Sequence, residues 1–207
     1  MFRKLYLSPL WLLISYVLRF LAFFQKPFMV YGCYNRVTKV YHKHTRIGSN
    51  VKMTDASKID IDDHVWIGHF CLLDGIGGIK IGKGVNIASH TVIYSHSSQN
   101  AIRFLGDKFI EVPAHKRPGY IIEKVVVGDY TFIGTGCILL PGTEIGKGCV
   151  VGAGSVLKGK FPDYSILVGN PAKVIGDTST VDQDLVSAGL PTNNYYDMSV
   201  LNSLNKS

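Results

Sequence analysis

An aliphatic residue recurs at every sixth position over much of the chain. Three runs carry this period: Ile61, Ile67 and Leu73; Ile81, Ile87 and Ile93; and Val127, Ile133, Leu139, Ile145, Val151 and Leu157, with a weaker start at Ile47 and Met53. A glycine often follows the aliphatic residue. A period of six matches neither a helix nor a long strand. It predicts short strands joined by tight turns, in which glycine adopts backbone angles that other residues resist.

Units of this kind stack into a solenoid in which each coil contacts only its neighbours. Three units of six make a coil of 18 residues with three flat faces, and the aliphatic column fills its interior. The same register places Cys71, Cys137 and Cys149 inside as small core residues. Together with Cys33 they form no CxxC pair, which favours a reduced, cytoplasmic setting over a disulfide framework.

Residues 1–31 are strongly apolar and aromatic, with scattered basic residues. Pro9 and Arg19 shorten the apolar stretch below the roughly 20 residues that a spanning helix needs. No small-residue cleavage site follows, which argues against a signal peptide. Two alternatives remain open: a helix packed on the body or on a partner subunit, and an interfacial helix on the inner face of the membrane. A transmembrane anchor is a third, less favoured one.

The chain carries 22 Lys+Arg against 15 Asp+Glu, a formal net charge of +7. This excess suggests an anionic partner, which could be nucleic acid, a membrane surface or a phosphorylated cofactor. No nucleic-acid-binding motif accompanies the charge, so we predict no nucleic-acid partner.

The repeat stops between Ile93 and Val127, and residues 94–124 are predicted to form a protruding loop. Loops that interrupt a rigid scaffold often carry function. His96 lies at the base of this loop, where an imidazole could act as a general base. By register, Asp74 lies at the same corner, one coil earlier. It could orient His96 or bind an acceptor hydroxyl, and a turn-capping role is the alternative.

Register separates the other histidines from this corner. His64 is predicted on a different corner at the surface, and His90 one corner before His96 as a structural residue. His115, in the loop, could reach a neighbouring subunit's site or the phosphates of a cofactor.

The segment VVVGDYTFIGTGCILLPGTEIGKGCVVGAGSVLKGKFPDYSILVGNPAKVIG at 125–176 resembles the left-handed parallel β-helix acyltransferases. It is most similar to the branch that contains galactoside, maltose and xenobiotic acetyltransferases and the O-acetyltransferases of surface polysaccharide synthesis, and the resemblance covers roughly residues 47–176. It implies a left-handed coil, a homotrimer, and acetyl-CoA as cosubstrate without a metal. In that family a histidine at the base of the loop takes the acceptor's proton, and His96 matches it by position.

The resemblance also implies a binding site for coenzyme A. A backbone N–H at Thr135 would lie near the thioester, and Phe132 stands where many sugar acetyltransferases carry tryptophan. Ala153 would stack directly on Thr135 one coil later, and a cluster of lysines would bind the adenosine phosphates. The predicted cofactor-binding residues are Phe132, Thr135, Gly142, Ala153, Lys158, Lys160 and Lys173.

The predicted organisation is all-β: an N-terminal apolar segment at 1–45, a left-handed β-helix at 46–176 and a C-terminal tail at 177–207. The tail is expected to leave the last coil as a short helix and then to be loosely ordered or to form an oligomer contact.

The predicted function is acetyl-CoA-dependent O-acetylation of a sugar hydroxyl on a surface polysaccharide or its precursor, by direct transfer with His96 as base and Asp74 beside it. The predicted setting is the cytoplasm, with possible peripheral contact to the inner membrane face through residues 1–31. N-acetylation of an amino-sugar nucleotide is the alternative. A γ-type carbonic anhydrase, with His64 and His69 as a superficial ligand pair, and a non-catalytic solenoid are remote ones.

Overall fold

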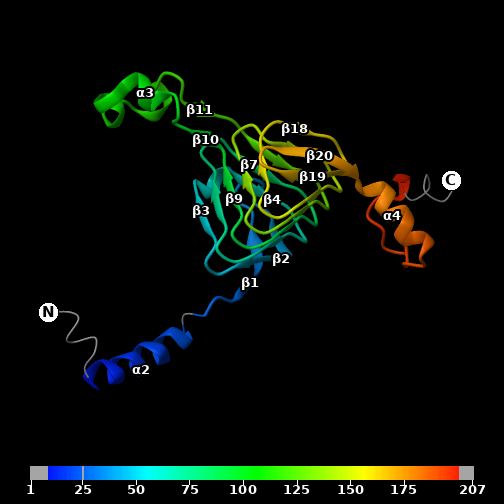
Figure 1. Ribbon diagram of the computed structural model, residues 1–207, viewed down its shortest axis with the longest axis horizontal. Helices are drawn as coiled ribbons and strands as arrows, with labels where there is room; N and C mark the ends of the chain where they lie inside the picture. The colour runs from blue at the N-terminus through cyan, green and yellow to red at the C-terminus, as the bar shows by residue number, and fades with distance from the viewer. Residues whose placement is uncertain (1–8, 25, 201–207) are drawn as a thin grey trace.

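The computed structural model describes residues 9–24 and 26–200, and its body is a three-sided left-handed β-helix (Figure 1). Each coil passes in turn through three sheets built mainly of parallel strands, which we name faces A, B and C. Face A holds β1 (Met29–Tyr34), β2 (Tyr41–Gly48), β5 (Trp66–Ile67), β8 (Asn86–Ile87), β13 (Phe132–Ile133), β16 (Val150–Val151), β19 (Ser165–Gly169) and β20 (Ala172–Asp177). Face B holds β3 (Lys52–Thr54), β6 (Leu72–Asp74), β9 (Val92–Tyr94), β14 (Ile138–Leu139) and β17 (Val156–Leu157). Face C holds β4 (Ile59–Ile61), β7 (Ile79–Ile81), β12 (Val125–Val127), β15 (Glu144–Ile145) and β18 (Lys160–Phe161).

The aliphatic period of six becomes three buried columns, one behind each face, as predicted. On face A, Ile67 pairs with Ile87, Ile87 with Ile133, and Ile133 with Val151. These side chains are fully buried, and their counterparts behind faces B and C join them in one continuous core. Aliphatic side chains of similar size, stacked at the strand spacing of roughly 4.8 Å, fill the interior of the prism.

The small residues of each repeat lie inside the coil next to the turns. Cys71, Cys137 and Cys149 are buried, as predicted, and burial raises the pKa of each thiol. Buried hydroxyls satisfy turn carbonyls that the ladders leave free, as where Thr131 Oγ1 donates to Gly146 O at 2.8 Å. The side chains at these positions are small because the backbone of the turn packs directly against them.

The corner between faces B and C departs from the predicted 18-residue coil. Two early coils take eight positions between the face B and face C columns, from Met53 to Ile61 and from Leu73 to Ile81, whereas Leu139 and Ile145 keep the regular six. The coil between them inserts the whole loop at this corner, with β10 (His96–Ser97) and β11 (Ile121–Ile122) as its antiparallel stem. Beyond the stem lie α3 (Ala101–Leu105) and 3-10 turns at Gly106–Ile110 and Ala114–Lys116.

The N-terminal part differs from the predicted boundary at 45. β1 pairs antiparallel with β2, so the hairpin from Met29 onward already belongs to face A. Helix α2 (Pro9–Phe24) precedes it and stands apart from the coil (Figure 1). Among the described residues, no helix is both long and apolar enough to cross a bilayer.

The described part of the tail is ordered against the coil, unlike the loosely ordered segment that we expected. β20 folds back on β19, and the predicted helix follows as α4 (Thr178–Ser187). The chain then returns to the corner between faces C and A, where Asp197 Oδ2 accepts from Lys147 Nζ at 2.6 Å and from Tyr164 Oη at 2.5 Å. Residues 201–207 lie outside the described part.

Candidate active site

His96 and Asp74 form a hydrogen-bonded pair at the corner between faces B and C. Asp74 ends strand β6 and pairs in register with Tyr94, which brings His96 beside it. His96 Nδ1 lies 2.8 Å from Asp74 Oδ1, and the two side chains are only 20% and 12% exposed. The coil register therefore placed both residues correctly, although they are 22 positions apart in the chain.

A second layer of hydrogen bonds holds the Asp74 carboxylate. Thr54 Oγ1, one coil earlier on the same column, donates to Asp74 Oδ2 at 2.8 Å. The Ile76 N–H lies 3.3 Å from Oδ1. An ionised carboxylate only accepts hydrogen bonds, so the arrangement places the His96 proton on Nδ1 and leaves Nε2 as the basic nitrogen.

The backbone around the pair is tied down by Ser95. This buried hydroxyl donates to Asp74 O at 2.5 Å and accepts from the Gly77 N–H at 2.8 Å. Gly77 is needed for the close approach, because a Cβ there would lie 2.3 Å from Ser95 O. The wide glycine turn at 75–78 thus fixes the height of the loop stem over Asp74.

The imidazole of His96 is enclosed by two tyrosines. The Tyr94 ring meets it edge-on, with centroids 5.9 Å apart, and the Tyr120 ring from the far side of the loop lies at 5.7 Å. Tyr120 was not predicted, because the loop carries no periodic signal that would align it with His96.

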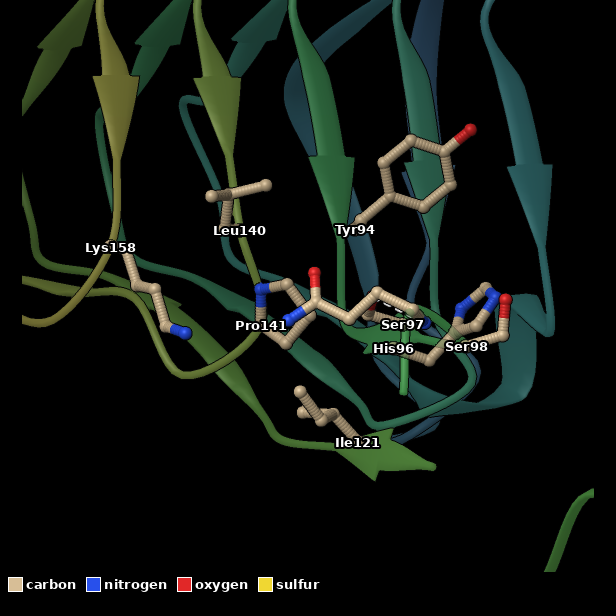
Figure 2. Close-up of a pocket in the computed structure, with 9 residues that line it drawn as sticks. Tyr94, His96, Ser97, Ser98, Ile121, Leu140, Pro141 and Lys158 are labelled. Atoms are coloured by element: carbon tan, nitrogen blue, oxygen red, sulfur yellow. Dashed lines mark hydrogen bonds between the residues drawn. The ribbon is translucent and has the colours of Figure 1, made fainter. Parts of the chain in front are cut away.

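A cavity of about 290 Å³ opens beside the pair. Figure 2 shows His96, Ser97 and Ser98 on one side of it and Leu140, Pro141 and Lys158 on the other, with Ile121 between them. Tyr94 and Gln99 complete the lining. The wall thus combines hydroxyl, amide and apolar groups with one cation, a set suited to a polar ligand that carries several hydroxyls.

The structure separates the three lysines that we expected to form one cluster. Lys158 follows β17 and lines the His96 cavity. Lys160 lies on face C, where its ammonium is 3.0 Å from Glu144 Oε2, and Lys173 lies on β20 of face A. The prediction relied on closeness in sequence, but successive residues of a three-sided coil turn onto different faces.

The residues predicted to flank the thioester lie at another corner. Thr135 and Ala153 are stacked at the turn between faces A and B, as expected, with the Gly154 N–H donating to Thr135 O at 2.9 Å. Both residues are exposed. Phe132, on face A, instead borders a separate cavity of about 400 Å³ beneath α4, and Gly142 lies at the His96 corner against Glu123.

Within one chain, Thr135 and His96 are therefore far apart. Thr135 lies in the turn that precedes β14, and Leu140, which lines the His96 cavity, follows this strand, so face B separates the two sites on the same coil. A single copy does not join the predicted base with the predicted thioester-binding turn.

His64 and His69 do not form the ligand pair that a carbonic anhydrase would need, because they lie at different corners. His69 Nδ1 is 3.0 Å from Asn50 Oδ1 at the corner between faces A and B. His64 stacks on His44 at the corner between faces C and A, with ring centroids 4.4 Å apart and Asp63 between their nitrogens. Among the described residues, this trio is the group whose spacing could hold a metal ion. His44 was missed, although it stands one 20-residue coil before His64.

His90 and His115 also lie away from the His96–Asp74 pair. His90 takes a left-handed backbone conformation, with φ of 64°, and stacks on Phe70 at 5.1 Å. His115 lies exposed in the 3-10 turn at Ala114–Lys116, at the far part of the loop.

Comparison with known proteins agrees with this geometry. Residues 124–159 match the family described as bacterial transferase hexapeptide (six repeats). The repeat and the three-sided coil are similar to those of the hexapeptide-repeat acyltransferases, and the relatives below carry acyltransferase names.

Two relatives come from Escherichia coli. The dTDP-4-amino-4,6-dideoxy-D-glucose acyltransferase is 29% identical over 169 residues, covering 78% of this chain and 82% of that protein. WbbJ of strain K12, whose name provisionally assigns it to O-acetyl transfer in lipopolysaccharide biosynthesis, is 32% identical over 117 residues. That match covers 56% of this chain and 59% of WbbJ, so the chain spans less than two thirds of WbbJ.

Among solved structures, AntD, an N-acyltransferase from Bacillus cereus in complex with dTDP and 3-hydroxybutyryl-CoA, shares the fold. The structural match covers 71% of this chain and 89% of AntD, with 24% sequence identity and a TM-score of 0.53.

Proposed function

We propose that the chain transfers an acetyl group from acetyl-CoA to a sugar hydroxyl of a surface polysaccharide or its precursor. The observation that carries the proposal is the His96–Asp74 pair, hydrogen bonded at 2.8 Å beside a polar cavity in a chain similar to the hexapeptide-repeat acyltransferases. A general base needs this kind of arrangement: the imidazole is oriented through Nδ1, and His96 lines a ligand-sized space. Because acetyl-CoA is an intracellular donor, the proposal places the reaction in the cytoplasm.

In this mechanism Nε2 of His96 takes the proton of the acceptor hydroxyl while its oxygen attacks the thioester carbonyl carbon. Asp74 stabilises the imidazolium that forms and keeps the proton on Nδ1. His96 then returns the proton to the thiolate that leaves as the new ester carbonyl re-forms. Transfer is direct, so no side chain carries the acetyl group.

The proposal includes a homotrimer with the donor held between subunits. The outward side chains of faces A and B form apolar columns, including Trp66 and Phe132 on face A and Ile138 on face B. Face C instead presents charged groups, as where Glu144 pairs with Lys160. Asn86 Oδ1, in the face A column, is buried without a hydrogen-bond partner among the described residues. A neighbouring copy on faces A and B would cover the apolar columns and bring its Thr135 turn toward this chain's His96.

In this arrangement the backbone N–H groups of Thr135 and Ala153 would bind pantetheine and the thioester oxygen. Lys158, at the cavity, is the lysine best placed to meet an anionic group near the reaction, whether a phosphate of the donor or of the acceptor. Lys160 and Lys173, on other faces, would serve the donor only if the neighbouring copy brings it past them.

N-acylation of an amino-sugar nucleotide is the second candidate. It is favoured by the relative with the larger coverage, whose name states an amino-sugar nucleotide substrate. The same base and cavity serve both reactions, because an amine and a hydroxyl each lose one proton as they attack. The acceptor decides between them.

Calorimetric binding of acetyl-CoA to the purified protein tests the donor first, because it requires no knowledge of the acceptor. We expect micromolar binding near one site per chain, weakened by Lys158→Ala and less affected by Lys160→Ala. No binding at millimolar acetyl-CoA would remove the proposal.

An acceptor screen then tests the base by following release of the CoA thiol with sugar hydroxyls, amino sugars and sugar nucleotides. His96→Asn is expected to abolish turnover while acetyl-CoA binding persists. The matched control is His64→Asn, because asparagine tolerates the left-handed backbone at that position and His64 lies at the corner between faces C and A. Equal activity of both variants would exclude His96 as the base, and an acetylated enzyme trapped without acceptor would exclude direct transfer.

A further inference from the structure

The charge of the chain is divided unevenly along the sequence. The first 54 residues hold nine of the 22 Lys+Arg and none of the 15 Asp+Glu. The remaining residues hold thirteen basic and fifteen acidic side chains, so they carry a net charge of −2. The whole positive excess of the molecule therefore belongs to the segment that contains α2 and the β1–β2 hairpin.

Helix α2 exposes large apolar side chains around its circumference. More than half of the surface of each of these residues is exposed: Leu10, Leu13, Tyr16, Val17, Leu18, Phe20 and Leu21. Figure 1 shows the helix standing away from the coil, so the body of the chain does not cover it. A contiguous exposed apolar surface of this kind marks an interaction site.

The length and composition of α2 fit the surface of a bilayer better than its interior. Its 16 residues extend about 24 Å at 1.5 Å each, which is less than the roughly 30 Å of hydrocarbon. Arg19 lies within the helix, and Lys26 follows it. Long basic side chains of this kind reach headgroup phosphates while the apolar side chains of the helix enter the acyl region.

The β1–β2 hairpin also exposes aromatic and basic side chains. Tyr31, Tyr34 and Tyr41 are each more than half exposed, and its connecting turn carries Arg36 and Lys39. Tyrosine rings favour the interface between membrane and water, and lysine and arginine bind anionic headgroups there. Apolar, aromatic and cationic surface thus follow one another from α2 into the first coil.

We propose that α2 and the β1–β2 hairpin bind the surface of an anionic lipid bilayer. A second copy of the chain is the competing occupant of the apolar helix. The charge of the segment argues against a second copy. Each copy would bring the same nine basic residues and no acidic one, so the two segments would repel each other. An anionic surface neutralises these charges instead.

This inference also specifies the acceptor, and in that respect it rests on the proposed function. In Figure 1, α2 and the loop helix α3 project toward the same end of the molecule, whereas α4 lies at the other. A bilayer bound by α2 would lie on the side from which the loop of the His96 cavity extends. The acceptor class that fits is a sugar carried on a membrane lipid.

Vesicle binding of the full-length protein tests the anchor. We expect co-sedimentation with vesicles of phosphatidylcholine and phosphatidylglycerol, weaker binding to phosphatidylcholine alone, and loss at high salt. Leu13→Gln/Val17→Gln, one turn apart on α2, should weaken binding at least tenfold. The matched control is Val181→Gln/Leu185→Gln, an exposed pair with the same spacing on α4, and it should bind like the parent. Replacing Arg36 and Lys39 with glutamine should cost about fivefold each on anionic vesicles.

The chain's two tryptophans report the depth of the segment independently. In Trp66→Phe, the remaining Trp11 of α2 should be quenched by vesicles containing brominated lipid. In Trp11→Phe, the remaining Trp66 on face A, two strands from Tyr31, should be quenched less.

Equal binding of the α2 and α4 variants, or unquenched Trp11, would overturn the inference. So would a lipid-free oligomer that falls apart in the α2 variant, because the helix would then bind a second copy. Acetyl-CoA calorimetry on the same preparations separates this result from failure of the proposed function. Retained donor binding without vesicle binding removes only the anchor.

Discussion

Replacing Asp74 tests whether His96 works as an oriented base. Asp74→Asn keeps the shape of the side chain, its oxygen can still accept from His96 Nδ1, and its amide can donate to Thr54 Oγ1. The substitution removes the negative charge 2.8 Å from the imidazole and little else. Asp74→Ala removes the charge and the hydrogen bonds with His96, Thr54 and Ile76.

The contact itself sets the magnitude of the effect. A hydrogen bond to a charged group contributes about 1.5–3 kcal/mol, and a neutral one about 0.5–1.5 kcal/mol. The difference of about 1–1.5 kcal/mol predicts a fall in kcat/KM of roughly five- to tenfold for Asp74→Asn. Asp74→Ala loses the whole interaction, and the fall should reach roughly 10- to 150-fold.

The assay is steady-state release of the CoA thiol with the best acceptor from the screen, beside calorimetric binding of acetyl-CoA. We expect kcat to fall in the order parent, Asn, Ala, with the donor affinity unchanged. If both variants keep parental turnover, His96 does not depend on Asp74. If acceptor KM rises while kcat is kept, Asp74 binds the acceptor instead of orienting the imidazole.

Three further predictions concern the scaffold. Ile133→Ala, in the fully buried face A column, should lower the free energy of unfolding by about 2–5 kcal/mol in urea titrations, and Ile133→Val by only about 0.5–1.5 kcal/mol; equal losses would contradict the stacked core. Gly134→Ala should lower the melting temperature, because the new Cβ would lie 2.6 Å from the backbone nitrogen of Ala153, whereas Gly106→Ala meets no atom and has only its φ of 51° against it. Docking of the tail should depend on pH: the hydrogen bond from Lys147 holds the pKa of Asp197 well below its usual range, so its contribution is complete above the unfolded pKa of about 3.9 and is lost as pH falls below it. Proteolysis of the tail should therefore accelerate in acid for the parent, while Asp197→Asn should be cleaved readily already at neutral pH.

The solenoid and its three buried columns, which were predicted from the period of six, were confirmed, whereas the coil length of 18 was wrong for the early coils, which take 20 residues. A strict repeat of six leaves each aliphatic residue one arrangement in which it is both buried and stacked on its counterparts, so the columns through Ile67 and Leu73 follow from counting. The His96–Asp74 contact was accessible by the same count, because both residues lie next to periodic positions at the edge of the loop. Thr54 and His44 could have been found in the same way, from the coil offset of 20.

Counting positions in the six-residue repeat did not predict the contacts made where the chain leaves the repeat. Lys158, Lys160 and Lys173 were grouped because they are close in sequence, but each turn of the coil sends neighbours to different faces. Tyr120 returns to His96 through a loop without any period. The order of the tail depends on Lys147 and Tyr164 meeting Asp197, a contact between segments more than 30 residues apart.

The amino-acid sequence thus determines the solenoid, its core and the corner that carries the candidate base, because a short-range period acts identically on every coil. Tertiary structure decides what surrounds that base: the cavity wall from Lys158, the tyrosine across the loop, and the separation of Thr135 from His96 within one chain. These features depend on which residues converge in space after the chain has left and rejoined the coil. Contacts of that kind have no regular spacing in the sequence, so the period cannot encode them.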